Sequence, residues 1–112
     1  MKTQLKKGTL DMCVLAALAA GDSYAYELVS ILARSMEVSE GTMYPLMRRL
    51  QAEAWVSIYL VESPSGPSRK YYTLTGSGRQ QLTLMQQEWQ EFVADVNSVL
   101  QLAAGQTKGE AS

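Results

Sequence analysis

The stretch "SEGTMYPLMRRL", Ser39 to Leu50, decides how the rest of the chain is interpreted. Its apolar residues recur at intervals of three and four, which places them on one face of an α-helix. These residues are Met43, Leu46, Met47 and Leu50. Yet Gly41 and Pro45, two of the poorest helix formers, both lie near the start of that helix. The stretch therefore predicts a helix with an unusual first turn.

Two residues can cap this helix at its N-terminus. If Thr42 is the cap, Pro45 falls in the first turn, where its missing N–H costs no helical hydrogen bond. If Ser39 is the cap, one hydrogen bond is lost close to the helix end. The free N–H groups of a first turn attract phosphate, and Gly41 lets another backbone approach closely. From this stretch alone, a first turn suited to such contact and a helix that merely begins at Thr42 both stay open.

The segments on either side of this helix follow a recognisable order. A helix from about Gln4 to Ala20 and a second helix capped by Ser23 precede it. After it, alternation over residues 56–61 predicts a strand, "ESPSGPS" over 62–68 a loop, and "RKYYTL" over 69–74 a second strand.

This order predicts a mainly α (α+β) fold, a winged helix-turn-helix domain over residues 1–75. The third helix, about 39–53, would enter the major groove of DNA, and the hairpin, about 55–75, would be the wing.

A long helix capped by Thr75 is expected to follow the hairpin, over residues 76–104, with a flexible tail over 105–112. Its apolar residues keep a strict heptad spacing, the pattern of a coiled-coil seam. They are Leu82, Met85, Trp89, Phe92, Val96, Val99 and Ala103. At about 1.5 Å per residue the helix is on the order of 40 Å long. A monomer would expose this seam to water, so the pattern predicts a homodimer.

The composition argues against an enzyme and favours a cytoplasmic protein. The sequence has no histidine, one cysteine and no glycine-rich phosphate-binding loop, so we expect neither catalysis nor a cofactor or metal. A lone cysteine suits a reducing compartment, and Cys13 in an apolar run predicts an inert, buried thiol. No secretory signal is visible, and the apolar run 12–20 is too short to cross a membrane.

The charge is unevenly distributed along the chain. Residues 1–79 hold nine Lys and Arg against seven Asp and Glu, whereas residues 80–112 hold one against four. The net charge of −1 does not by itself indicate a nucleic-acid partner. The cations nevertheless gather where the predicted helix-turn-helix would meet double-stranded DNA. The candidate DNA-binding residues are Ser39, Thr42, Tyr44, Arg48, Arg49, Ser68, Arg69 and Lys70.

The stretch "VSEGTMYPLMRRL", followed by "GPSRKYYTLTGSGR", resembles the PadR family of transcriptional regulators. The similarity covers Leu5 to about Leu102. It implies a dimeric winged-helix repressor whose third helix and wing bind operator DNA and whose last helix dimerises. Carried over, it implies that Thr42, Tyr44 and Arg48 lie on the DNA side of the third helix. Arg69 and Lys70 would lie on the wing, supported by Tyr71 and Tyr72.

The sequence departs from the family pattern at two places. Tyr24-Ala25 stands where members often have His-Gly, and Gly76 stands where they usually have proline. The first departure puts in doubt any contact made by that histidine. The second removes a residue that would fix the start of the last helix.

The short chain resembles the compact PadR subgroup, some members of which bind flat, aromatic, drug-like molecules at the dimer interface. The tryptophan on their last helix matches Trp89, although a tryptophan at a heptad position can also be ordinary interface packing. Asp11 or Asp95 could offset the charge of a cationic ligand. The candidate effector-binding residues are Leu5, Met12, Leu15, Met85, Trp89, Phe92 and Val93.

The alternative to a repressor is a dimeric winged-helix interaction module that does not bind DNA, since a fold does not fix a function. Four cations discriminate between the two: Arg48, Arg49, Arg69 and Lys70. An interaction module has no need to align positive charge on both the third helix and the wing.

Overall fold

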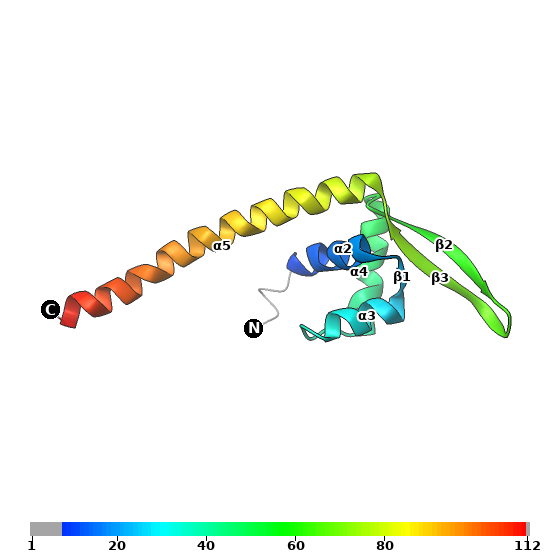
Figure 1. The fold of residues 1–112 in the computed structure, drawn as a ribbon, viewed down its shortest axis with the longest axis horizontal. Coiled ribbons are helices and arrows are strands. Elements are labelled where there is room, and N and C mark those ends of the chain that lie inside the picture. The colour runs from blue at the N-terminus through cyan, green and yellow to red at the C-terminus, as the bar shows by residue number, and fades with distance from the viewer. Residues whose placement is uncertain (1–7, 112) are drawn as a thin grey trace. The chain divides into compact units, whose positions relative to one another are not determined.

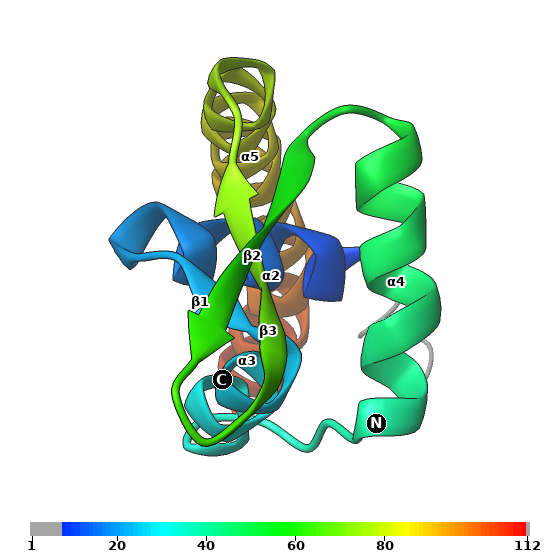
Figure 2. The ribbon, with the colours of Figure 1, turned by 90° about the vertical axis from the view of Figure 1, so that its right-hand side faces the viewer.

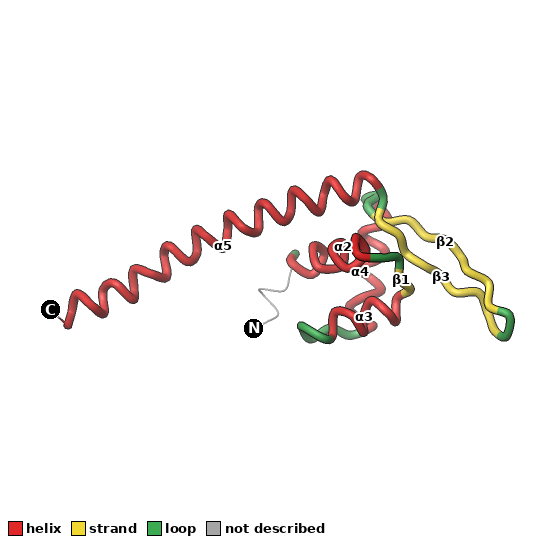
Figure 3. The backbone as a smooth tube through the Cα atoms, in the orientation of Figure 1, coloured by secondary structure: helices red, strands yellow, loops and turns green. Residues whose placement is uncertain are grey.

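The computed structural model describes the backbone of residues 8–111 and the side chains of residues 8–105. The chain divides into two compact units, Met1–Leu82 and Thr83–Ser112. We call the first the winged-helix unit and the part of the last helix beyond Leu82 the distal helix. The elements, in chain order, are α2 (Thr9–Ala20), β1 (Ser23–Tyr24), α3 (Ala25–Ala33), α4 (Glu40–Ala52), β2 (Val56–Ser63), β3 (Gly66–Leu74) and α5 (Gly76–Ala111) (Figures 1 and 3).

The core of the winged-helix unit lies where α2, α3, α4 and the sheet meet. The apolar stripe predicted for the third helix is confirmed, because all of its members are buried. The helix α4 contacts α3 and β2, and α2 in turn contacts α3 and β3. The fully buried side chains are Val14, Leu15, Leu18, Leu28, Met43, Met47 and Leu50. The unit therefore buries the α4 stripe against its own elements.

The first helix begins at Thr9 in the part of the chain that the structure describes, after Gly8 with a φ of 86°. A positive φ suits glycine, which has no Cβ to clash with the backbone. The earlier start expected for this helix, at Gln4, lies outside the described residues.

The three strands form an antiparallel sheet in the order β1-β3-β2. Figure 2 shows the hairpin of β2 and β3 together with the short strand β1. The short strand β1 was not predicted, because two residues cannot show an alternating pattern. Its Ser23 does not cap the second helix. The hydroxyl of Ser23 is buried and donates to the carbonyl of Gly21 at 3.4 Å, and α3 begins only at Ala25.

The wing is a longer hairpin than predicted. Its strands extend through most of the proposed loop over 62–68 and leave only Pro64 and Ser65 between them. Pro67 lies within β3, although proline cannot donate a hydrogen bond to a neighbouring strand. It is tolerated because β1 pairs only with Tyr71 and Tyr72, so β3 is paired on one side at that position.

Ser39, and not Thr42, caps the helix α4. The backbone N–H of Thr42 donates to Ser39 Oγ at 3.3 Å. Pro45 is therefore inside the helix and one helical hydrogen bond is lost, as the Ser39 alternative implied. A Cβ placed on Gly41 would meet only Ser39 Oγ, at 3.8 Å, an ordinary contact.

Hydrogen bonds hold the start of α5 against the base of the wing. Thr75 caps the helix as predicted, because its Oγ1 accepts from the N–H of Gly78 at 2.9 Å. The same hydroxyl donates to the carbonyl of Ala54 at 2.7 Å, and Thr75 N donates to Trp55 O at 3.0 Å. A Cβ on Gly78 would lie only 2.1 Å from Trp55 O, so this close approach requires glycine.

The distal helix exposes most of the predicted heptad residues. Trp89, Phe92 and Val99 are 42%, 57% and 63% exposed, whereas Leu82 is buried in the winged-helix unit. The helix continues to Ala111, past the end expected at residue 104. None of the helices in the described range is long and apolar enough to span a membrane.

Candidate nucleic-acid interface

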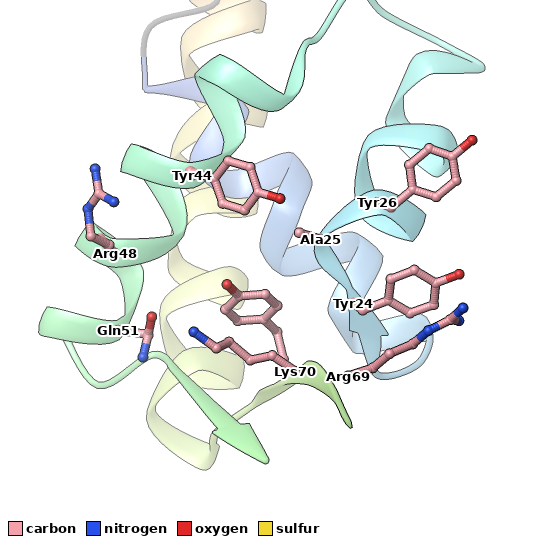
Figure 4. Close-up of a pocket in the computed structure, with 9 residues that line it drawn as sticks. Tyr24, Ala25, Tyr26, Tyr44, Arg48, Gln51, Arg69 and Lys70 are labelled. Carbon is pink, nitrogen blue, oxygen red and sulfur yellow. The ribbon is translucent and has the colours of Figure 1, made fainter. Parts of the chain in front are cut away.

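A hollow of about 610 Å³ opens on the surface of the winged-helix unit, between α3, α4 and β3 (Figure 4). We call it the basic hollow. Three of its lining residues are cations and four are tyrosines, and no acidic residue is among the nine. They are Tyr24, Ala25, Tyr26, Tyr44, Arg48, Gln51, Arg69, Lys70 and Tyr72.

The third helix contributes Tyr44, Arg48 and Gln51 to the hollow. Their spacing of four and three residues places them on one face of α4, beside the buried stripe. Tyr44 is 47% exposed and Arg48 is also exposed, so both side chains are free to meet a partner. The amphipathic pattern of α4 thus fixes which of its polar side chains point into the hollow.

The wing contributes Arg69 and Lys70 from β3. The Arg69 guanidinium lies over the ring of Tyr24, 4.6 Å from the ring centroid (Figure 4). This distance is within the range of a cation–π interaction. The floor of the hollow includes Tyr72, which is buried, and burial raises the pKa of its phenol.

A row of tyrosines crosses the sheet beside the hollow. Tyr24 on β1 and Tyr59 on β2 are both register partners of Tyr71 on β3. The ring centroids of Tyr24 and Tyr71 are 5.5 Å apart at an interplanar angle of 68°, and those of Tyr59 and Tyr71 are 5.7 Å apart at 18°. Such cross-strand aromatic pairs stabilise a sheet. We call Tyr24, Tyr71 and Tyr59 the tyrosine row.

The tyrosine row ends at Asp22, which accepts a hydrogen bond from Tyr59. The hydroxyl of Tyr59 donates to Asp22 Oδ2 at 2.8 Å. Hydrogen bonds from Thr73 and Tyr59 lower the pKa of Asp22, and the hydrogen bond to Asp22 raises the pKa of Tyr59. The row therefore has a carboxylate at one end and the Arg69 guanidinium at the other.

The structure brings together four of the eight predicted DNA-binding residues: Tyr44, Arg48, Arg69 and Lys70. Ser39 and Thr42 are exposed at the start of α4, where they form the cap, and Ser68 is exposed on the wing. None of these three lines the hollow.

Arg49, another predicted DNA-binding residue, does not line the basic hollow. Its Nη2 donates to Asp11 Oδ1 of α2 at 2.6 Å. The reason is geometric, since adjacent residues of a helix point about 100° apart and Arg48 already faces the hollow. The sequence could not show this ion pair between residues so distant in the chain.

Sequence reasoning missed Tyr24, Tyr26 and Gln51 as lining residues. Gln51 follows Arg48 by three positions, so helical spacing could have identified it. Tyr24 had a weaker signal, its departure from the family pattern. Its place beside Arg69 depends on the pairing of β1 with β3, which the sequence did not predict.

The predicted effector-binding residues are distributed over both units. Leu15 has no exposed surface, so a ligand would reach it only if the core opened, and Leu5 lies outside the described residues. Met12 is half-buried, and Asp11 is already paired with Arg49.

The distal helix holds the remaining candidates. Trp89 and Phe92 are exposed, with ring centroids 6.5 Å apart, and Met85 and Val93 are partly exposed. Asp95, which could balance a cationic ligand, is exposed on the same helix.

No other reactive centre is visible in the described part of the chain. Among the side chains of residues 8–105, no cluster of histidine, cysteine, aspartate or glutamate could hold a metal ion. Cys13 is partly buried, and this burial raises the pKa of its thiol. A raised pKa lowers the fraction of reactive thiolate at neutral pH.

Comparisons with known proteins relate the chain to one family. The family model described as "Transcriptional regulator PadR-like family" matches residues 14–84. A PadR-like transcriptional regulator from Bacillus cereus is 39% identical with a TM-score of 0.80, over 88% of this chain and 98% of that one. A PadR family transcription regulator from Clostridium difficile is 32% identical with a TM-score of 0.77, over 83% and 99% of the two chains.

The fold also matches that of a regulator crystallised on DNA. Bacillus subtilis PadR in complex with operator DNA is 24% identical, with a TM-score of 0.65, over 70% of this chain and 46% of that one. At this identity the likeness concerns the fold alone.

Proposed function

Because the chain belongs to the PadR-like family of transcriptional regulators, we propose that it binds operator DNA as a homodimer and represses transcription. It is a transcriptional regulator of the PadR type and not an enzyme. The basic hollow is the observation that carries the proposed DNA binding. The Bacillus subtilis regulator of the same fold was crystallised with operator DNA, which makes a duplex the natural partner for such a surface.

The hollow has the chemistry of a nucleic-acid contact. Arg48 comes from the helix expected in the major groove, and Arg69 and Lys70 come from the wing. Contacts from such side chains to phosphate oxygens fix the register of a protein on a duplex. Tyr44 and Gln51 can donate to and accept from base edges, which would add sequence preference.

The first turn of α4 offers a second point of contact. Nothing in the surroundings of Gly41 requires glycine, because a Cβ there would make only an ordinary contact with Ser39. A glycine that the fold does not need, at the exposed start of this helix, is explained by a close approach of the DNA backbone. The same glycine that makes the helix a poor one would then make it a better phosphate site.

The distal helix supports the proposed homodimer. Its exposed seam includes Trp89, Phe92, Val96 and Val99. An apolar stripe of this length favours association with a second copy, since water would otherwise cover it. Two winged-helix units related by a two-fold axis would then contact two half-sites of a palindrome.

We also propose that a flat aromatic molecule modulates the regulator through Trp89. The indole and the Phe92 ring are exposed and adjacent, so a planar cation could stack on them. Tryptophan fluorescence during titration with planar cationic dyes tests this. Saturable quenching in the wild type that is lost in Trp89→Ala, with Trp55 as the background, is the expected result. Equal quenching in both proteins would reject Trp89 as the site.

The proposed DNA binding is tested by incubating the purified protein with sheared genomic DNA and sequencing the retained fragments. We expect enrichment of a palindrome with half-sites about one helical turn apart, ~34–36 Å, or a multiple of that. Retention of no fragment above background would favour the interaction module without DNA binding. An enriched site next to genes whose transcription rises when the protein is removed would support the repressor role.

A further inference from the structure

We propose that Tyr24 is a positioning residue that holds the Arg69 guanidinium at the edge of the basic hollow, ready for a DNA phosphate. The inference rests on the proposed function, because it concerns how the wing meets a duplex. It assigns to Tyr24 a role that acts through Arg69, and it adds this residue to Tyr71 and Tyr72, which were expected to support the wing.

The side chains of Arg69 and Tyr24 are in close contact and differ in their exposure to solvent. The Arg69 guanidinium lies 4.6 Å from the centroid of the Tyr24 ring (Figure 4). Arg69 is exposed, whereas Tyr24 is partly buried. A guanidinium stacked on an aromatic face keeps the N–H groups at its edge free for a carboxylate or phosphate. The stacking therefore orients the group without using the donors that phosphate needs.

The Tyr24 ring is itself held from two sides. Its backbone N–H donates to Glu27 Oε1 at 3.2 Å at the start of α3, and its residue pairs with Tyr71 across β1 and β3. Its ring packs against that of Tyr71, with centroids 5.5 Å apart. A cation resting on a fixed ring is more restricted than a cation on a mobile surface side chain.

The tyrosine row extends this support across the whole sheet. Tyr71 stacks on Tyr59 at 5.7 Å, and the hydroxyl of Tyr59 donates to Asp22 at 2.8 Å. The three rings thus connect β1, β3 and β2 on one face of the sheet. Arg69, two residues before Tyr71 on β3, extends from the same face as Tyr71.

Restricting Arg69 before binding increases affinity for DNA. A free arginine side chain loses rotational freedom when it contacts a phosphate, and a preoriented one loses less. The contact is with phosphate, so the gain should not depend on base sequence. Loss of Tyr24 should therefore weaken binding to any duplex, and only when Arg69 is present.

The test measures binding of the full-length protein to a fluorescein-labelled 30-base-pair duplex of mixed sequence, over a series of salt concentrations. The variants are Tyr24→Phe, Tyr24→Leu, Arg69→Ala and the double variant Tyr24→Leu/Arg69→Ala. We expect Tyr24→Leu to bind about three- to tenfold more weakly and Tyr24→Phe to bind within about twofold of the wild type. In the Arg69→Ala background, Tyr24→Leu should cause no further loss.

The salt series separates positioning from damage to the fold. If Tyr24→Leu removes the Arg69 contact, the slope of log affinity against log salt should fall by up to about 0.9, as for Arg69→Ala. Equal losses from Tyr24→Leu with and without Arg69 would overturn the proposal. A wild type that binds no duplex would instead overturn the proposed function, and this inference with it.

A second measurement needs neither DNA nor a Tyr24 variant that folds. In the NMR spectrum of the wild type, the δ-methylene protons of Arg69 should be shifted upfield by the ring current of Tyr24, whereas those of Arg48 should not. Coincident Arg69 and Arg48 shifts would show that the guanidinium is not held over the ring in solution, and would overturn the proposal.

Discussion

The winged-helix unit and the distal helix differ in the exposure of their apolar residues. In the winged-helix unit, Leu15, Met47 and Leu50 are at most 1% exposed. In the distal helix, Phe92, Val99 and Leu102 are 57%, 63% and 70% exposed. The first region closes its core with its own elements, whereas the second presents an apolar surface to its surroundings. Stability is thus internal to one region, and we propose that it comes from association in the other.

The largest effect is expected from placing charged residues in the exposed apolar seam of the distal helix. Phe92→Glu with Val96→Glu should convert a dimer into monomers or unfolded chains, because like charges cannot pack in a coiled-coil seam. Affinity for a palindromic site should fall by roughly a hundredfold or more, since one half-site contact is then lost. Sedimentation velocity at micromolar concentration measures the first effect, and a DNA titration measures the second.

A matched control places the same charges on the opposite side of the distal helix. Gln90→Glu with Ser98→Glu changes exposed positions outside the heptad seam. This variant should remain a dimer. A wild-type protein that sediments as a monomer would contradict the association proposed for this region.

The winged-helix unit should be destabilised by a substitution in its interior, where the start of α5 meets the base of the wing. Gly78→Ala would place a Cβ 2.1 Å from Trp55 O, so the helix start would have to move. We expect a loss of about 3 kcal/mol in unfolding free energy, a fall in Tm of roughly 10 °C or more. Gly76→Ala is the control, because a Cβ there meets nothing within 4 Å. Equal Tm values for the two variants would contradict the close approach.

The cap of α4 should show a smaller effect within the same region. Ser39→Ala removes the oxygen that accepts from Thr42 N at 3.3 Å. The expected cost is about 1 kcal/mol, or roughly 4–8 °C in Tm, measured by thermal unfolding. Ser98→Ala in the distal helix should instead be neutral or slightly stabilising, because alanine is the better helix former. A Ser39→Ala protein with an unchanged Tm would show that the cap contributes nothing.

The smallest expected effect concerns the thiol of Cys13. Burial raises the pKa of this group, so little thiolate is present near pH 7. Labelling by a thiol reagent at pH 7 should be several-fold slower in the folded protein than in denaturant. Equal rates in the two states would show that the core of the winged-helix unit opens readily around α2.

The sequence predicted those elements whose pattern is local. The apolar period of α4 and the alternation in the wing placed both elements within one residue of their observed ends, apart from the tip of the hairpin. The strand β1 was missed because two residues carry no periodicity, and its existence depends on pairing with β3. A local pattern can identify an element but not its distant partner.

In the candidate interface, too, the sequence identified residues that follow a local pattern and missed those placed by distant contacts. Tyr44, Arg48, Arg69 and Lys70 were identified because helical spacing and the basic wing expose them. The sequence could not show that Arg49 lies outside the hollow, because its partner, Asp11, is 38 residues away. Tyr24 was missed as a lining residue because only the folded sheet brings it beside Arg69.

The central claim, that the basic hollow contacts DNA, is tested most directly by comparing two variants on the same duplex. Arg48→Ala with Lys70→Ala removes two cations of the hollow, and Arg49→Ala removes a cation that pairs with Asp11 outside it. We predict that the double variant lowers the slope of log affinity against log salt by about 1.8, while Arg49→Ala leaves it unchanged. An unchanged slope in the double variant, or an equal loss per cation in both proteins, would contradict the claim.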